Sequence, residues 1–350
     1  MRFNRYVYIS ISTKYMPKHN GGHEVNRKIL LWIGIIILAS LASAAGTTYY
    51  FTIIMRGKST LVVATTTSLY DTGLLDAIEK KFEEKYPIDV YFISVGTGQA
   101  IEHAKRGDAD VILVHAPSSE LQFLTEGYGL CRKIIAYNFF IIAGPENDPA
   151  SIRGLNVTSA LNRIVEMGRA GKVKWISRGD ESGTHKKEQA LWSLAGYSWV
   201  TLKEEEWFVE SGTGMGKTLL IANEMEAYLL ADIGTYLRYY KEGKINLKPL
   251  VKQDKDLLNV YSVIAVNPEK VGGVNFNNAI IFIKFLISSE CQNLIANFKR
   301  NEYGQSLFYP AASLLKEGTN PIVEWIKEYA FFNGEECPPE YWDDHPELYQ

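Results

Sequence analysis

Cysteine is scarce in this sequence, and the three that occur are far apart. Cys131, Cys291 and Cys337 form no CxxC pair, so the spacing that zinc sites require is missing. One disulfide with a leftover thiol and three free thiols are both compatible with this pattern. The length of 350 residues is enough for two ordinary domains.

Positive charge is scarce in most of the chain. Residues 1–58 contain eight Lys and Arg and a single acid, Glu24, and the remaining residues carry 29 Lys and Arg against 39 Asp and Glu, a net charge of −10. A protein body this acidic lacks the broad basic face with which proteins bind nucleic acid. An anionic ligand would therefore have to be held by local donors.

Long apolar runs are missing, with one exception near the N-terminus. Residues 29–55 contain no charged side chain and are long enough to cross a bilayer. Basic residues cluster before this run, which predicts that residues 1–28 are cytoplasmic and that the body lies outside the cytoplasm. The small residues at 42–45 also suit a removable signal peptide, but the run is longer than a usual signal core. We therefore favour an uncleaved transmembrane anchor over a signal segment; the true start, Met1 or Met16, stays open.

After this run, strand-like and helix-like segments alternate. Strands are expected at residues 60–64, 88–95, 110–114, 134–143, 173–176, 206–210 and 260–266, and helices at 74–86, 99–105, 157–169 and 186–194. This alternation predicts an α/β protein with mostly parallel sheets. The strands 134–143 and 260–266 are expected to cross between two domains.

Polar and glycine-rich segments follow several of these strands. They are Thr65-Thr66-Thr67-Ser68, Gly96-Thr97-Gly98, the segment from Arg178 to His185, and the segment from Ser211 to Thr218. Parallel sheets bind ligands at the carboxyl ends of their strands. The unpaired N–H groups and the dipole of a helix N-terminus attract anions there. Each segment alone could be a helix cap, but their coincidence favours a site for an oxyanion.

The segment Arg178-Gly179-Asp180-Glu181-Ser182-Gly183-Thr184-His185 combines a cation with two hydroxyls at such a junction. Asp180 stands two residues from Arg178 and is placed to hold its guanidinium group. The competing interpretation is a capped helix with a solvated arginine.

The segment Ser211 to Thr218 nearly matches the ATP-binding loop G-x-x-x-x-G-K-[ST], but it begins with Ser in place of Gly. ATP is scarce outside the membrane, where this segment is expected to lie. We therefore favour a role for Thr213 and Gly214 in lining a cleft over an ATPase.

Taken together, these segments resemble the tungstate-binding components of tungstate ABC transporters. The resemblance covers residues 60–313 and includes Gly107-Asp108-Ala109-Asp110-Val111 with His115, and Gly214-Met215-Gly216 with Thr218. The spacing from Arg178 to Thr184 is also similar to that of phosphate-binding proteins. The resemblance implies a two-lobed, periplasmic-binding-protein-like type II fold. Lobe 1 would be residues 59–136 plus 260–333, lobe 2 residues 137–259, and residues 334–350 an acidic surface tail.

The resemblance also implies the residues that hold the anion. They are Thr66, Thr67, Ser68, Thr97, Arg178, Ser182, Gly183, Thr184, Thr213 and Gly214, with Asp180 in support of the arginine. No cofactor, metal site or catalytic residue is implied. We expect His115 to be a structural residue more than a ligand contact.

The sequence therefore predicts a monomeric, membrane-anchored, extracytoplasmic receptor that captures tungstate or molybdate and delivers it to an ABC permease. Tungstate carries no proton at neutral pH whereas hydrogen phosphate does, so a site made of donors alone favours tungstate or molybdate. The sequence does not discriminate between these two ions. A receptor for phosphate or another tetrahedral oxyanion, a tethered anion sensor and an ATPase using residues 211–218 stay as alternatives. No nucleophile, base and orienting acid can be assigned, so an enzyme is not expected.

Overall fold

A computed structural model describes residues 32–43, 46, 59–318 and 320–350. Residues 58–350 form one compact unit. Within the predicted anchor, Trp32–Ser43 is a short apolar helix, and the rest of residues 29–55, Gly46 apart, lies outside the described residues. Among the described residues, no single helix is both long enough and apolar enough to span a membrane. Two consecutive helices, Phe276–Leu286 and Ser289–Tyr303, meet this criterion only together and are bent by 60°. The transmembrane anchor thus stays a prediction.

The compact unit begins with alternating strands and helices. In chain order these are β1 (Ser59–Thr66), α2 (Thr67–Tyr70), α3 (Leu74–Lys85), β2 (Ile88–Val95), α4 (Thr97–Lys105), β3 (Val111–Val114), α5 (Pro117–Thr125) and β4 (Gly129–Gly144). The predicted strand 88–95 is confirmed. Strand β4 begins five residues before the predicted start at 134, because ion pairs allow the charged Arg132 and Lys133 to be buried within it.

The middle of the chain continues this alternation. Its elements are α6 (Val157–Arg169), β5 (Trp175–Ser177), α7 (Gly183–Leu194), α8 (Trp199–Leu202), β6 (Phe208–Glu210), α9 (Met215–Glu224), β7 (Leu229–Asp232), α10 (Ile233–Lys241), β8 (Lys248–Val251), η1 (Lys255–Leu257) and β9 (Leu258–Val266). The predicted helix 157–169 is confirmed, and Asn156 caps it by accepting a hydrogen bond from the Ser159 N–H.

The last part of the chain is mainly helical. It consists of α11 (Phe276–Leu286), α12 (Ser289–Asn297), α13 (Arg300–Tyr303), β10 (Tyr309–Pro310), α14 (Ala312–Glu317), α15 (Pro321–Ala330), η2 (Pro339–Tyr341) and η3 (Pro346–Leu348). The apolar helix α11 packs into the core cluster that contains Phe82 of α3, and Cys291 and Ile295 of α12 join the same cluster.

The main sheet has the strand order β10-β4-β9-β3-β1-β2, and β7 and β8 also pair with β4. Strand β1 runs parallel to β2 and β3, whereas β9 is antiparallel to both β3 and β4. The expectation of mostly parallel sheets is therefore wrong, and the sheet is mixed. The reason is that the chain leaves β4, forms the elements from α6 to η1, and then returns as β9, which runs beside β4 in the opposite direction.

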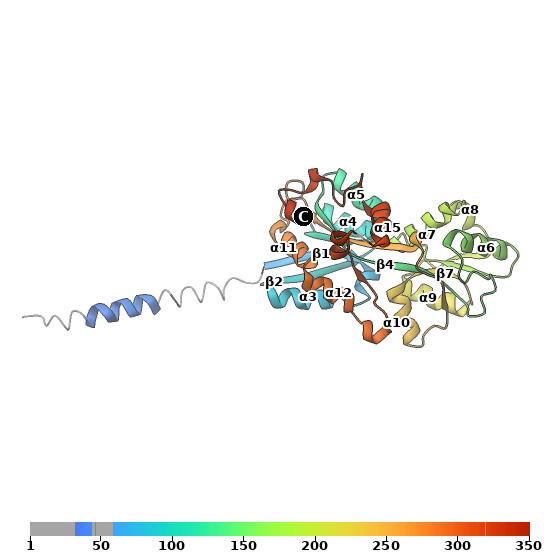
Figure 1. The fold of residues 1–350 in the computed structure, drawn as a ribbon, viewed down its shortest axis with the longest axis horizontal. Helices are drawn as coiled ribbons and strands as arrows, with labels where there is room; N and C mark the ends of the chain where they lie inside the picture. Colours follow the sequence, from blue (N-terminus) through green and yellow to red (C-terminus); the bar gives the residue numbers. More distant parts are fainter. Residues whose placement is uncertain (1–31, 44–45, 47–58, 319) are drawn as a thin grey trace, which may run out of the picture. The chain divides into compact units, whose positions relative to one another are not determined.

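Strand β4 extends from one half of the compact unit into the other (Figure 1). Its first part pairs with β9 from Gly129 to Phe139, and its last part pairs with β7 and β8 from Phe140 to Gly144. The buried side chains form separate clusters in the two halves, around Phe82 and Phe282 in one and around Trp175 and Trp192 in the other. The boundaries of the two predicted lobes stay a prediction.

The acidic C-terminal segment is not the surface extension that its composition suggests. Glu336 forms an ion pair with Lys133 of β4, and the Tyr349 hydroxyl donates to the Arg132 carbonyl. Trp342 stacks on Tyr349 with ring centroids 4.6 Å apart, and Leu348 is buried. The acidic C-terminal segment is thus packed against Arg132 and Lys133 of β4. All three cysteines are buried and free.

The contribution of the buried ion pair between Glu120 and Arg132 to the free energy of unfolding can be tested by mutation. Both side chains are fully buried, and the Arg132 Nε donates to Glu120 Oε2 at 2.9 Å. Glu120→Ala leaves the arginine buried without its partner, which we expect to lower the free energy of unfolding by about 3–5 kcal/mol. Glu324→Ala is the matched control, because it removes a solvent-exposed pair with Lys327. Chemical denaturation curves that shift equally for both variants would contradict this account.

Candidate functional site

Four junctions between a strand and a helix meet at one cleft. At these junctions β1 leads into α2, β2 into α4, β5 into α7 and β6 into α9. The cleft has a volume of about 600 Å³, and the predicted residues that line it are Thr67, Arg178, Asp180, Ser182 and Gly214. Every other predicted site residue lies within two positions of a lining residue. A second hollow of about 650 Å³ near Trp207 contains none of them.

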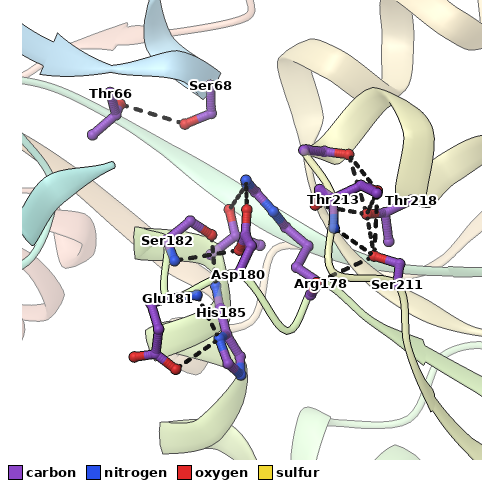
Figure 2. Close-up of polar contacts among 12 residues, drawn as sticks. Thr66, Ser68, Arg178, Asp180, Glu181, Ser182, His185, Ser211, Thr213 and Thr218 are labelled. Carbon is purple, nitrogen blue, oxygen red and sulfur yellow. Dashed lines mark hydrogen bonds and ion pairs between the residues drawn. The ribbon is translucent and has the colours of Figure 1, made fainter. Parts of the chain in front are cut away.

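Arg178 follows β5 and occupies the centre of this arrangement (Figure 2). Its side chain is only 3% exposed, and its Nη2 forms an ion pair with Asp180, as predicted from their spacing. Its Nη1 donates to the Thr184 hydroxyl at 3.3 Å. Its Nε is buried and has no hydrogen-bond partner among the described residues. Because buried N–H groups are rarely left unpaired, the Nε is free to donate to a ligand or to an ordered water.

The N-terminus of α7 provides further donors beside the arginine. Ser182 is the cap residue: its hydroxyl oxygen accepts the His185 N–H at 3.3 Å, while its own N–H donates to Asp180. The hydroxyl proton of Ser182 is therefore available for a ligand. The first N–H groups of a helix, here those of Gly183 and Thr184, also lack partners within the helix.

The junction after β1 faces Arg178 from across the gap (Figure 2). The hydroxyls of Thr66 and Ser68 lie 3.4 Å apart, and both side chains are buried. Thr65 differs from them, because its hydroxyl donates to the Leu113 carbonyl at 2.9 Å and is thereby used by the sheet. The Thr97 hydroxyl at the start of α4 is buried with no hydrogen-bond partner among the described residues.

The segment from Ser211 to Thr218 closes the third side of the site. Its hydroxyls bond to one another: Ser211 Oγ lies 2.8 Å from Thr218 Oγ1, and Thr213 Oγ1 lies 3.4 Å from the same Thr218 oxygen. Ser211 also donates to the Arg178 carbonyl at 3.2 Å. The structure places Thr213 beside the cleft with its hydroxyl in this network, and only Gly214 lines the cleft. The segment thus supports the backbone of Arg178.

Glu188 is a buried acid behind the arginine that the sequence analysis did not identify. It accepts hydrogen bonds from Trp175 Nε1 at 2.6 Å, from Ser177 Oγ at 3.0 Å and from the Arg178 backbone N–H. Burial raises its pKa to about 7, although these donors oppose the shift. In the sequence it stands in a polar stretch of a helix, so nothing there indicates that β5 buries it.

His115 is the second residue whose importance emerges from the structure. It is 4% exposed, and its ring lies against Gly183: a Cβ added at that glycine would come within 2.8 Å of the His115 Nε2. The same position lies 3.3 Å from the Thr97 hydroxyl. Glycine at 183 therefore allows α7 to approach residues of the first part of the chain closely.

The arrangement as a whole offers several donors to a ligand, and the carboxylates of Glu102 and Glu181 also line the cleft. Arg178, the hydroxyls of Thr97 and Ser182, one hydroxyl of the bonded pair Thr66 and Ser68, and the N-terminus of α7 can donate. The nearby carboxylate of Asp180 is already engaged by Arg178. Such a site suits an anion that carries no proton, because every oxygen of the anion requires a donor once water is removed.

The buried Glu188 makes a prediction about pH. With a folded pKa of about 7 and a usual value of 4.5, the folded state holds a proton between these pH values that the unfolded state has lost. The stability that this proton confers is complete below about pH 4.5 and is lost as pH rises through about 7. Relative to Glu188→Gln, the wild type should lose about 2–3 kcal/mol of unfolding free energy between pH 5 and pH 7.5.

Denaturant titrations at the two pH values would measure this difference. Glu324→Gln, a substitution of an exposed glutamate, is the control and should follow the wild-type profile. Parallel pH profiles for the wild type and Glu188→Gln would contradict the assignment.

Several known proteins resemble this chain over most of its length. The PBP superfamily domain matches residues 42–290. The chain is 41% identical over 261 residues to the tungstate-binding protein TupA of Peptoclostridium acidaminophilum, with 74% of this chain and 88% of that protein covered. It is 38% identical over 231 residues to TupA of Campylobacter jejuni, with 65% and 83% covered. The solved structure of TupA from Desulfovibrio alaskensis G20 aligns with a TM-score of 0.64 at 38% identity, over 72% of this chain and 98% of that one. The chain therefore belongs to the PBP superfamily and, within it, to the family of TupA substrate-binding proteins.

Proposed function

We propose that this protein captures tungstate, or the nearly identical molybdate, in the cleft around Arg178 and delivers it to an ABC permease. The observation that carries the proposal is the buried guanidinium group, which Asp180 holds in place and whose Nε lacks a partner among the described residues. The names of the relatives, which are tungstate-binding proteins, support the choice of ligand.

Two sides of the cleft would grip the anion. Thr66, Thr67, Ser68 and Thr97 donate from predicted lobe 1, and Arg178, Ser182, Gly183, Thr184 and Gly214 donate from predicted lobe 2, with Thr213 beside them. A ligand that bonds to both sides binds the closed arrangement more tightly than an open one and so shifts the population toward it. A permease can then distinguish the loaded receptor from the empty one by its shape.

The proposed preference for tungstate over phosphate rests on the different protonation of the two anions at neutral pH. Hydrogen phosphate carries a proton at neutral pH and gains from a carboxylate that accepts it, whereas tungstate carries none. The carboxylate nearest to the arginine is Asp180, and it is occupied by that arginine. A receptor for phosphate or a tethered anion sensor remains the alternative.

An ATPase is disfavoured by the segment from Ser211 to Thr218. Its hydroxyls are bonded to one another, and the side chain of Lys217 is exposed. The lysine of a phosphate-binding loop would have to reach the phosphates.

The proposal includes a location. We infer that residues 29–55 anchor the protein in the cell membrane and that its body works outside the cytoplasm as a monomer. The uncharged length of this run and the basic residues before it support the anchor.

Ligand choice can be tested by calorimetric titration of the full-length protein with tungstate, molybdate, sulfate, phosphate and ATP. We expect tungstate and molybdate to bind at least a hundredfold more tightly than hydrogen phosphate, because the carboxylate nearest to the arginine, Asp180, is engaged by Arg178 and does not accept the proton of hydrogen phosphate. Tighter binding of phosphate than of tungstate would overturn the proposal.

Arg178→Ala tests the location of the site. Removing the central charge-assisted donor should weaken tungstate binding by about a hundredfold or more. Arg169→Ala is the matched control, because that arginine lies on the surface of the same half and pairs with Glu205. It should bind as the wild type does. Equal affinities for the wild type and Arg178→Ala would show that the anion binds elsewhere.

Fractionation tests the anchor. The full-length protein should stay in the membrane pellet after an alkaline carbonate wash, whereas a variant that starts at Ser59 should be released. An intact mass that corresponds to cleavage near residue 45 would show instead that the segment is a signal peptide.

A further inference from the structure

His115 is buried at the point where α7 meets the first part of the chain. It follows β3, and its ring stacks on Tyr261 of β9 with centroids 5.1 Å apart. Its Nε2 is buried and has no hydrogen-bond partner among the described residues, like the Thr97 hydroxyl and the Arg178 Nε. These three atoms surround the start of α7, where Gly183 and Thr184 contact His115 and Arg178.

A chain of hydrogen bonds determines which nitrogen of His115 carries the proton. The Leu307 carbonyl can only accept, and it accepts from Asn138 Nδ2 at 3.3 Å, so Asn138 Oδ1 points to Asn259 and accepts from its Nδ2 at 3.0 Å. Asn259 Oδ1 must then accept from His115 Nδ1, 2.8 Å away. The neutral ring therefore has its proton on Nδ1 and a lone pair on Nε2.

This lone pair conflicts with the proposed ligand. A dianion beside Nε2 would face an acceptor, which is unfavourable, whereas a protonated Nε2 would be a charge-assisted donor. In the empty site the ring stays neutral, because burial and the charges of Arg178 and Lys187 lower its pKa to about 4. A dianion adds two negative charges at short range in a buried site and reverses the balance.

We propose that His115 is a further anion-contacting residue, and that its Nε2 takes up one proton from solvent when tungstate binds. The proposal rests on the proposed function. Binding of the anion is then coupled to the uptake of a proton. The affinity for tungstate falls as pH rises, by up to about tenfold per pH unit where the free ring is neutral and the bound ring is charged.

Other groups near the site also titrate, and the experiment has to separate them. Glu188 has a pKa raised to about 7, and Lys187 has a pKa lowered to about 8, both by burial. His185 is the other histidine near the cleft, and burial lowers its pKa as well. Burial raises the pKa of Asp232, and the nearby charge of Arg178 partly opposes this shift. Among the described residues that titrate near the site, only His115 combines an unpartnered buried nitrogen with contact to Gly183.

The test counts protons by calorimetry at pH 7.0. Full-length protein is titrated with tungstate in buffers of different ionisation enthalpy, and the slope of the observed heat gives the protons taken up per anion. We expect the wild type to take up about one proton more than His115→Gln. We expect Glu188→Gln and Lys187→Met to keep this difference from His115→Gln, whatever their affinities. Equal counts for the wild type and His115→Gln, or a loss of uptake only in Glu188→Gln, would overturn the proposal.

A second measurement uses the unaltered protein, in case His115→Gln does not fold. The ring nitrogens of the six histidines are labelled with ¹⁵N. Saturating tungstate should move one Nε2 resonance from the position of an unprotonated nitrogen to that of an imidazolium. Unchanged histidine resonances in protein that binds tungstate would refute the proton uptake alone, whereas absence of tungstate binding would refute the proposed function.

Discussion

The site depends on the burial of one guanidinium group. Arg178 is almost fully enclosed, with one carboxylate beside it, and its Nε is left without a partner among the described residues. Burying a charge is costly unless hydrogen bonds and counter-charges compensate it. Glu188 and Ser211 fix the backbone of the arginine, and Asp180 and Thr184 fix its side chain. The donor that remains free is therefore held ready before the ligand arrives, which reduces the ordering that binding requires.

The sequence was sufficient for the parts of the site that are local in the chain. The pairing of Asp180 with Arg178 follows from a spacing of two residues, whereas α7 begins at Gly183, three residues before the predicted start at 186, because Ser182 caps it. Glu188 and His115 could not be assigned in this way, because their partners lie on β5 and β9 and only the fold brings them together. The same reason applies to the mixed sheet and the packed tail, where β9 and Glu336 reach β4 from more than a hundred residues away.

The crossing strands carry polar residues in a region that would otherwise be apolar. Asn138 of β4 and Asn259 of β9 are buried and hydrogen-bonded to each other, and Asn259 also donates to the Tyr261 hydroxyl. A buried hydrogen-bonded pair of this kind specifies one register for the two strands, because a shift by one residue would leave each amide unpaired. The register of β4 and β9 and the orientation of the His115 ring are therefore set by the same contacts.

The long pairing of β4 with β9 also has a consequence for how the chain is made. Strand β4 emerges from the ribosome long before β9, and the elements from α6 to β8 lie between them in the sequence. The half of the protein that contains Trp175 and Trp192 is thus complete while the other half still lacks β9, α11 and the tail that holds Arg132. Domains fold in the order in which they are completed during synthesis. The half built from both ends of the compact unit can therefore be completed only after the half that contains Trp175 and Trp192 has been synthesised.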